Sequence, residues 1–190
     1  SEMCIRDSST FDHDWVKQQI ETTSVNTVLE KNWPGLHIEP LQAPENMEVL
    51  IGWTGSPASS PHLVSEVKRL KADPAFYGEF LDHSHQCVEY LIHAFKTNNI
   101  KGVQKMIRQN RAIIRKMDDQ ASVDIETDKL KSLCDIAEKH GGAAKTSGAG
   151  GGDCGITIIH QHVDKQKIYD EWIENDIKPC LLYTSDAADE

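Results

Sequence analysis

Long hydrophobic runs and an excess of positive charge are both missing from this chain of 190 residues. No apolar stretch approaches the roughly 20 residues needed to cross a bilayer, and the first residues carry no signal-peptide core. The net charge of −10 argues against general binding to nucleic acids or anionic membranes. We therefore expect a cytoplasmic location and neither a nucleic-acid nor a membrane partner.

Closely spaced cysteine pairs are also missing. The five cysteines form no Cys-x-x-Cys motif, which favours reduced thiols in an intracellular protein. Nine histidines include the close pairs His83/His85 and His160/His162, but neither pair has a third and fourth ligand at a useful spacing. We expect no metal site in this chain.

The most informative feature that is present is a glycine-rich segment, Lys145 to Gly155, with five glycines in eight residues. Glycine accepts positive φ and leaves the main chain accessible, so successive amides can converge on an anion such as phosphate. A flexible linker is the alternative reading of such a run. The β-branched residues Ile156–Ile159 that follow are typical of a strand, which favours a loop inside a folded unit.

Two common phosphate motifs do not explain this loop. Gly150, Gly152 and Gly155 satisfy Gly-x-Gly-x-x-Gly, but a dinucleotide site needs a helix directly afterwards, and a strand is predicted there. A Walker A loop ends in Gly-Lys-Ser/Thr, whereas Lys145 precedes the glycines. The predicted phosphate site is therefore of another kind.

The hydrophobic periodicities predict an α+β fold in which helices and strands interleave irregularly. Caps are expected at Ser59 or Ser60, Asp73 and Thr127. Two short helices are predicted within residues 11–31, and longer ones from Ser60 to about 71, from Asp73 through 95, around 103–117, around 130–137 and at 164–175. The predicted strands are 36–41, 47–53, 154–160 and 177–181.

Three segments carry a resemblance to a known family. Lys145 to Gly155 resembles the third conserved motif of the GHMP kinases, and Asp153-Cys154 is similar to its form in phosphomevalonate kinases. The stretch 52–60 with Leu63-Val64, and the stretch 32–41, are similar to segments of the same enzymes. The resemblance extends from about residue 9 to about 181 and is nearest to staphylococcal-type enzymes.

The resemblance implies a ferredoxin-like α/β sandwich, the GHMP kinase C-terminal domain, over residues 46–181, preceded by a remnant of the N-terminal domain at 9–45. It also implies transfer of a phosphoryl group from Mg²⁺-bound ATP to (R)-5-phosphomevalonate on the route to isoprenoids. The family's nucleotide loop and catalytic acid have no counterpart here, so this chain alone is expected to be inactive. Residues 1–8 and 182–190 match nothing in the family and are expected to be non-native tails.

The resemblance implies that the candidate residues surround the acceptor phosphate. Lys145 and Ser60 are the candidates for direct contact with it, although Lys145 can be a solvated strand residue and Ser60 only a helix cap. Asp153 can orient a loop amide or Lys145, and Asn110 either faces the substrate cleft or is a satisfied buried amide. The full set expected to bind substrate is Ser60, Lys145, Ser147, Gly148, Ala149, Gly150, Gly151, Gly152 and Asp153, with Asn110 as a further candidate.

Two alternative functions stay open. One is another GHMP kinase activity, such as that of mevalonate kinase, and the other is a phosphate-binding module without catalysis. Recovery of the nucleotide loop and an acidic catalytic residue in the same reading frame would favour an enzyme over a module.

Overall fold

The computed structural model describes residues 12–36, 40–57, 70, 72–148 and 150–180. These residues form two compact units, one up to residue 41 and one from residue 42 onward. Within the described ranges, no helix is both long and apolar enough to cross a membrane.

The smaller unit contains the two short helices predicted within residues 11–31, α2 (His13–Thr22) and α3 (Val25–Leu29). The Asp12 carboxylate accepts a hydrogen bond from the Trp15 amide at 2.9 Å and so caps α2. The strand predicted at 36–41 is wrong at its described positions, because Leu36, Pro40 and Leu41 lie outside regular structure. Proline lacks the amide that a central strand needs.

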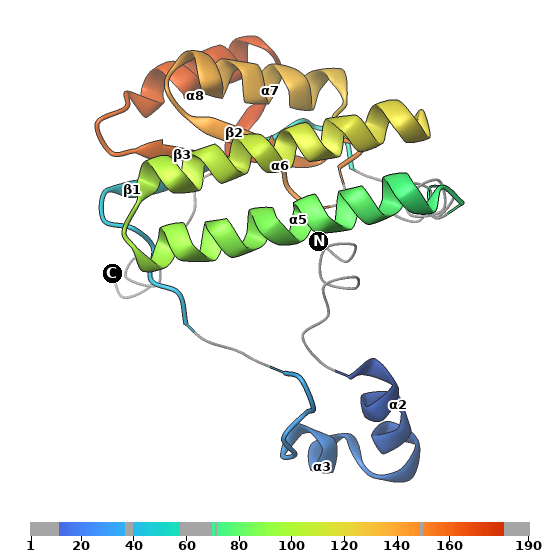
Figure 1. The fold of residues 1–190 in the computed structure, drawn as a ribbon. Helices are drawn as coiled ribbons and strands as arrows, with labels where there is room; N and C mark the ends of the chain where they lie inside the picture. Colours follow the sequence, from blue (N-terminus) through green and yellow to red (C-terminus); the bar gives the residue numbers. More distant parts are fainter. Residues whose placement is uncertain (1–11, 37–39, 58–69, 71, 149, 181–190) are drawn as a thin grey trace. The chain divides into compact units, whose positions relative to one another are not determined.

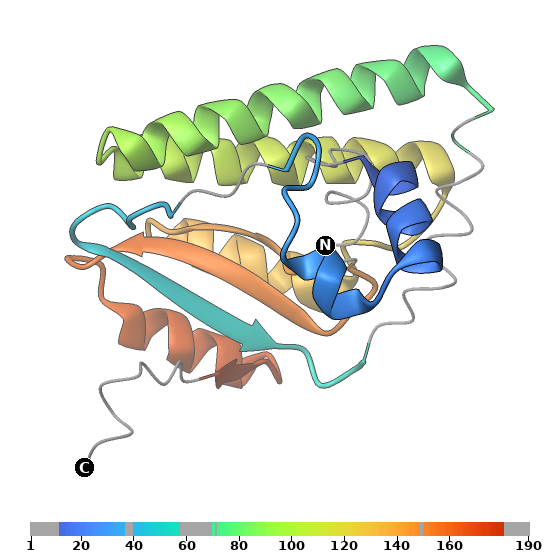
Figure 2. The same ribbon diagram turned by 90° about the horizontal axis from the view of Figure 1, so that it is seen from below.

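The larger unit is built on a four-stranded antiparallel sheet in the order β2-β3-β1-β4. This is the strand order of the ferredoxin-like fold, so the predicted α+β class and architecture are confirmed. Figure 2 shows β1 and β3 running side by side at its centre. The strands are β1 (Met47–Trp53), β2 (Ala143–Thr146), β3 (Cys154–His160) and β4 (Lys178–Cys180).

Within the described residues, the larger unit contains four complete helices, and side-chain caps begin them. Asp73 accepts from the Phe76 amide at 3.1 Å with Pro74 in the first turn, and Thr127 accepts from the Leu130 amide at 3.4 Å, as the sequence predicts. The helix predicted from Ser60 to about 71 lies outside the described residues, apart from Leu70. The helices are α5 (Pro74–Lys96), α6 (Ile100–Ala121), α7 (Asp128–Lys139) and α8 (Lys165–Glu174).

Helices cover both faces of the sheet, as Figure 1 shows with α7 and α8 on one side and α5 and α6 on the other. Successive strand residues point to opposite faces. Ala143 and Ile158 therefore pack against α5 and α6, while their neighbours Ala144 and Ile159 pack against α7 and α8. The strands β2 and β3, which flank the glycine-rich loop, are therefore packed on both faces of the sheet.

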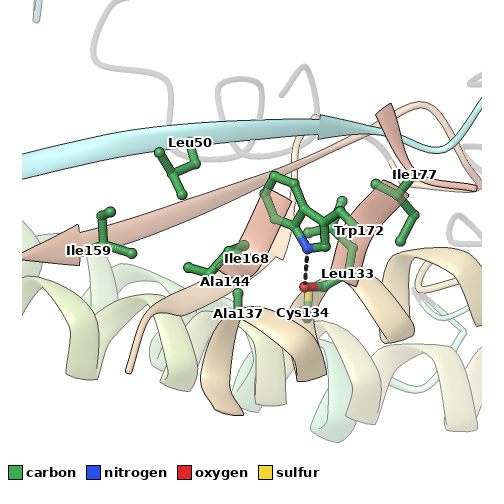
Figure 3. Close-up of a cluster of buried hydrophobic side chains, with 9 residues drawn as sticks. All are labelled: Leu50, Leu133, Cys134, Ala137, Ala144, Ile159, Ile168, Trp172 and Ile177. Carbon is green, nitrogen blue, oxygen red and sulfur yellow. Dashed lines mark hydrogen bonds between the residues drawn. The ribbon is translucent and has the colours of Figure 1, made fainter. Parts of the chain in front are cut away.

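The cluster under α7 and α8 is centred on Trp172 and Leu133, both fully buried (Figure 3). The Trp172 indole N–H donates to the Leu133 carbonyl at 3.0 Å, so its one polar group is satisfied. Leu133 lies over Gly52 of β1 and Gly155 of β3, where a β-carbon would be only 2.7 and 2.6 Å from its methyl groups. These two glycines let α7 approach the sheet at the base of the glycine-rich loop.

Candidate functional site

The glycine-rich loop, residues 147–153, is the hairpin connection between β2 and β3. Thr146 and Gly155 are paired where the ladder ends, and the Ser147 amide donates to the Cys154 carbonyl at 2.9 Å. Residue 149 lies outside the described residues. Both ends of the loop are therefore held in a defined register by the sheet.

The backbone of the loop lies largely in the left-handed region. The φ angles of Gly148, Gly150, Gly151 and Gly152 are 69°, 76°, 76° and 121°, and that of Asp153 is 58°. Residues with a β-carbon rarely adopt such angles, and 121° is accessible to glycine alone. The glycines are thus required by the path of the chain, as the phosphate-loop reading expects.

Hydrogen bonds anchor the loop on two sides. The Gly151 amide donates to the Ile125 carbonyl at 2.8 Å, and the Asp153 amide donates to the Ser56 carbonyl at 2.6 Å. The Asp153 carbonyl accepts from the Thr54 amide at 2.8 Å. This network distinguishes the loop from a free linker, whose amides face water.

The same network determines which loop amides already have an acceptor within the protein. Those of Ser147, Gly151 and Asp153 donate within the protein. The amides of Gly148, Gly150 and Gly152 have no acceptor among the residues that the structure describes. Of the loop residues expected to bind substrate, Gly148, Gly150 and Gly152 therefore have amides that remain available to a ligand, while Ala149 lies outside the described residues.

Lys145 stands at the entrance of the loop. It pairs with Ile156 in the ladder, is half-buried, and its Nζ lies 2.6 Å from the Thr146 carbonyl oxygen, to which it donates. The ammonium group is therefore held next to the first peptide of the loop. A fixed cation in this position offsets the negative charge of a bound phosphate.

A second cation lies near the other end of the loop and was not singled out from the sequence. The Lys129 Nζ donates to the carbonyls of Thr54 and Asp176 at 3.3 and 3.4 Å. Thr54 in turn binds Asp153, so Lys129 brings positive charge to the base of the loop. Its exposed position in the first turn of α7 resembles that of many surface lysines, and no sequence signal marks it.

The Asp153 side chain is exposed, and the described contact of its carboxylate is with Cys154, whose Sγ lies 3.8 Å away. Burial raises the pKa of the Cys154 thiol to about 11, and the negative charge of Asp153 adds to the rise. The backbone groups of Asp153, rather than its side chain, tie the loop to residues 54–56.

We expect the Cys154 thiol to react with iodoacetamide about tenfold more slowly than a cysteine in a short peptide at neutral pH. Its higher pKa lowers the thiolate fraction roughly a hundredfold, and the greater nucleophilicity of that thiolate recovers part of the loss. Mass spectrometry of the Cys154 peptide measures the rate, which should still be rising at pH 10. A rate that levels off near pH 8 would contradict the raised pKa.

The remaining candidates are not brought into the loop by described contacts. Asn110 is half-buried on α6, and no hydrogen bond of its side chain to another described residue is recorded. Ser60 and Ala149 lie outside the described residues. No group of three or more His, Cys, Asp or Glu suited to a metal ion occurs in the described ranges.

Comparisons with known proteins identify the family of this domain. Residues 91–178, which contain the glycine-rich loop, match the family described as GHMP kinases C terminal. The whole larger unit has the α+β fold of that domain, with its four-stranded antiparallel sheet. The chain thus contains a GHMP kinase C-terminal domain.

Its named relatives include phosphomevalonate kinases. The chain is 37% identical over 149 residues to the phosphomevalonate kinase of Streptomyces sp. (strain CL190). The aligned region covers 78% of this chain and 40% of that protein. The structure of the Lin0012 protein from Listeria innocua matches with 36% identity and a TM-score of 0.83, covering 92% of this chain and 49% of that one.

A third relative has been solved with ligands. The structure of Streptococcus pneumoniae phosphomevalonate kinase in complex with phosphomevalonate and AMPPNP matches with 28% identity and a TM-score of 0.74. The match covers 91% of this chain and 49% of that protein. The chain therefore spans about half the length, or less, of the relatives it resembles. A resemblance to the staphylococcal type in particular is not shown.

Proposed function

We propose that this chain is the acceptor-binding portion of a phosphomevalonate kinase, which converts (R)-5-phosphomevalonate and ATP to the 5-diphosphate and ADP. The observation that carries the proposal is the anchored glycine-rich loop, with its left-handed glycines and Lys145 at its entrance, inside the region that matches the GHMP kinases. The ligands named for the Streptococcus relative support the choice of substrate.

In this reaction the loop would position the acceptor phosphate and neutralise part of its charge. An oxygen of the acceptor phosphate attacks the γ-phosphorus of ATP, the bond to the β–γ bridging oxygen breaks, and ADP leaves. Both reactants are anions, so the acceptor must be held against repulsion and in line with the leaving group. The amides of Gly148 and Gly150 and the Lys145 ammonium are suited to hold it.

In this proposal, ATP and Mg²⁺ bind mainly to residues outside the glycine-rich loop. The described residues bring no cluster of carboxylates together for a metal ion, and the loop lacks the Walker A order of residues. The family resemblance assigns the nucleotide loop and the catalytic acid to an N-terminal domain. The predicted boundaries at 46–181 and the terminal tails remain part of this proposal.

We expect the 190-residue chain to form no diphosphate by itself, and a chimera to do so. In the chimera, residues 9–181 replace the matching region of the Streptomyces kinase, and release of ADP on adding phosphomevalonate measures turnover. A folded chimera that phosphorylates mevalonate instead would favour the mevalonate kinase alternative. A folded chimera without kinase activity that still binds phosphomevalonate would favour a non-catalytic module.

The same chimera tests the residues. Lys145→Met and Ser60→Ala should each raise the KM for phosphomevalonate about tenfold or more and leave that for ATP nearly unchanged, because a charge-assisted hydrogen bond contributes roughly 1.5–3 kcal/mol. Lys101→Met, at an exposed position on α6, is the matched control for the loss of one charge. A rise in the KM for ATP alone would assign the loop to the nucleotide.

A further inference from the structure

The connection between α6 and α7, residues 122–127, is in direct contact with the glycine-rich loop. The Ile125 carbonyl accepts from the Gly151 amide at 2.8 Å. A β-carbon on Gly150 would lie 2.5 Å from that same oxygen and would overlap the Ile125 side chain, which is itself buried. The position of Ile125 therefore decides where the middle of the loop lies.

Ile125 is held in turn by a carboxylate of α6. The two oxygens of Asp118 accept hydrogen bonds from the amides of Ile125 and Glu126 at 2.7 and 2.9 Å. Ile125 is thus fixed at its amide by Asp118 and at its carbonyl by Gly151. One residue links the helix to the loop.

A buried ion pair fixes the next residue. Arg111 binds Glu126 through two parallel hydrogen bonds of 2.8 and 2.7 Å, and it reaches Asp135 of α7 at 2.7 Å. The Glu126 side chain is only 3% exposed and that of Arg111 11%. A bidentate pair of this kind is strongly directional, so it sets the orientation of the connection against both helices.

This arrangement is a poor way to stabilise α6. Asp118 lies in the last turn of the helix, where the helix dipole disfavours a negative charge. Burial raises the pKa of Asp118, and the nearby charges of Asp124 and Glu126 raise it further. The two backbone hydrogen bonds lower the pKa, but the rise is larger. The ionised carboxylate is therefore held at some expense of stability, a feature that often marks a positional requirement.

We infer that Asp118 and Glu126 are positioning residues, which hold the α6–α7 connection so that the glycine-rich loop is already ordered before its anion binds. Ordering a flexible residue on binding costs backbone entropy, and glycine loses the most. A loop ordered in advance spares the ligand that cost. The inference rests on the proposed function only where the anion is identified as phosphomevalonate.

Hydrogen exchange on the 190-residue chain tests the positioning without any ligand. In Asp118→Ala, the Gly151 amide should exchange at least tenfold faster, while Ile158 and other amides within β3 keep their protection. Asp119→Ala removes the same charge from the neighbouring exposed position and should change neither. Asp118→Asn keeps one acceptor and should give an intermediate rate. Unchanged protection of Gly151 in folded Asp118→Ala, or an equal loss throughout β3, would overturn the inference.

Kinetics of the chimera separate this inference from the proposed function. If both are correct, Asp118→Ala and Glu126→Gln raise the KM for phosphomevalonate about tenfold, with little change in the KM for ATP. Faster exchange at Gly151 with an unchanged phosphomevalonate KM would support the positioning and contradict the role of the loop as the acceptor site.

Discussion

Gly150→Ala should destabilise the 190-residue chain by about 2–5 kcal/mol. Two effects add: a left-handed backbone disfavours a residue with a β-carbon by roughly 1–2 kcal/mol, and overpacking against Ile125 adds about 1–3 kcal/mol. The midpoint of urea unfolding measures the change. The sequence alone predicts that Gly150→Val or Gly151→Val in the full-length enzyme reduces activity far more than stability. The contact between Gly150 and Ile125 instead predicts that Gly150→Val reduces both strongly.

Gly55→Ala is the matched control for this prediction. Gly55 has a similar φ of 84°, but a β-carbon there would meet no atom within 4 Å. Its replacement should therefore show the backbone effect alone, about 1–2 kcal/mol. Equal losses for the two variants would show that the contact between Gly150 and Ile125 contributes nothing.

Leu133→Ala should destabilise the chain by about 2–5 kcal/mol, because it empties the centre of the cluster under α7 and α8. Gly155→Ala should also destabilise, by about 1–3 kcal/mol, since its new methyl group would lie 2.6 Å from a Leu133 methyl. In the double variant that methyl group enters the vacated space. The double variant should then lose at least about 1 kcal/mol less stability than the sum of the two single losses.

Leu130→Ala provides the control for this coupling. Leu130 is equally buried on α7 but is not among the atoms nearest to Gly155. Its combination with Gly155→Ala should be additive within about 0.5 kcal/mol. Urea unfolding of the three single and two double variants gives both coupling energies. Additivity in the Leu133 pair would contradict the close approach of α7 to β3.

Local signals in the sequence predicted several elements correctly. Asp73 followed by proline, and Thr127, mark the starts of α5 and α7 because a cap acts on amides only two or three residues away. The alternation of β1 and the β-branched run of β3 are equally local. The sequence separates the helices that became α5 and α6, but it did not single out the residues that break them, Asn98 in the left-handed region and the cap Asn99.

Other elements carried too little local signal. β2 consists of Ala143-Ala144-Lys145-Thr146, of which only threonine favours strands, and it exists because it pairs with β3 and is buried between α6 and α7. The segment 36–41 has the opposite character. Its apolar residues favour a strand, but its described positions have no ladder partner. Pairing, rather than propensity, decided both cases.

The sequence by itself determined the α+β class, the place of the glycine-rich loop and the need for positive φ within it, because these depend on residue type and short spacing. Only the tertiary structure decided which loop amides already have an acceptor, and that Ile125 of the α6–α7 connection contacts the loop. The contact of Ile125 with Gly150 and Gly151 joins residues 25 or more positions apart, and no local periodicity encodes such a meeting. Packing against α7 and the α6–α7 connection turns a glycine-rich sequence into an anchored loop.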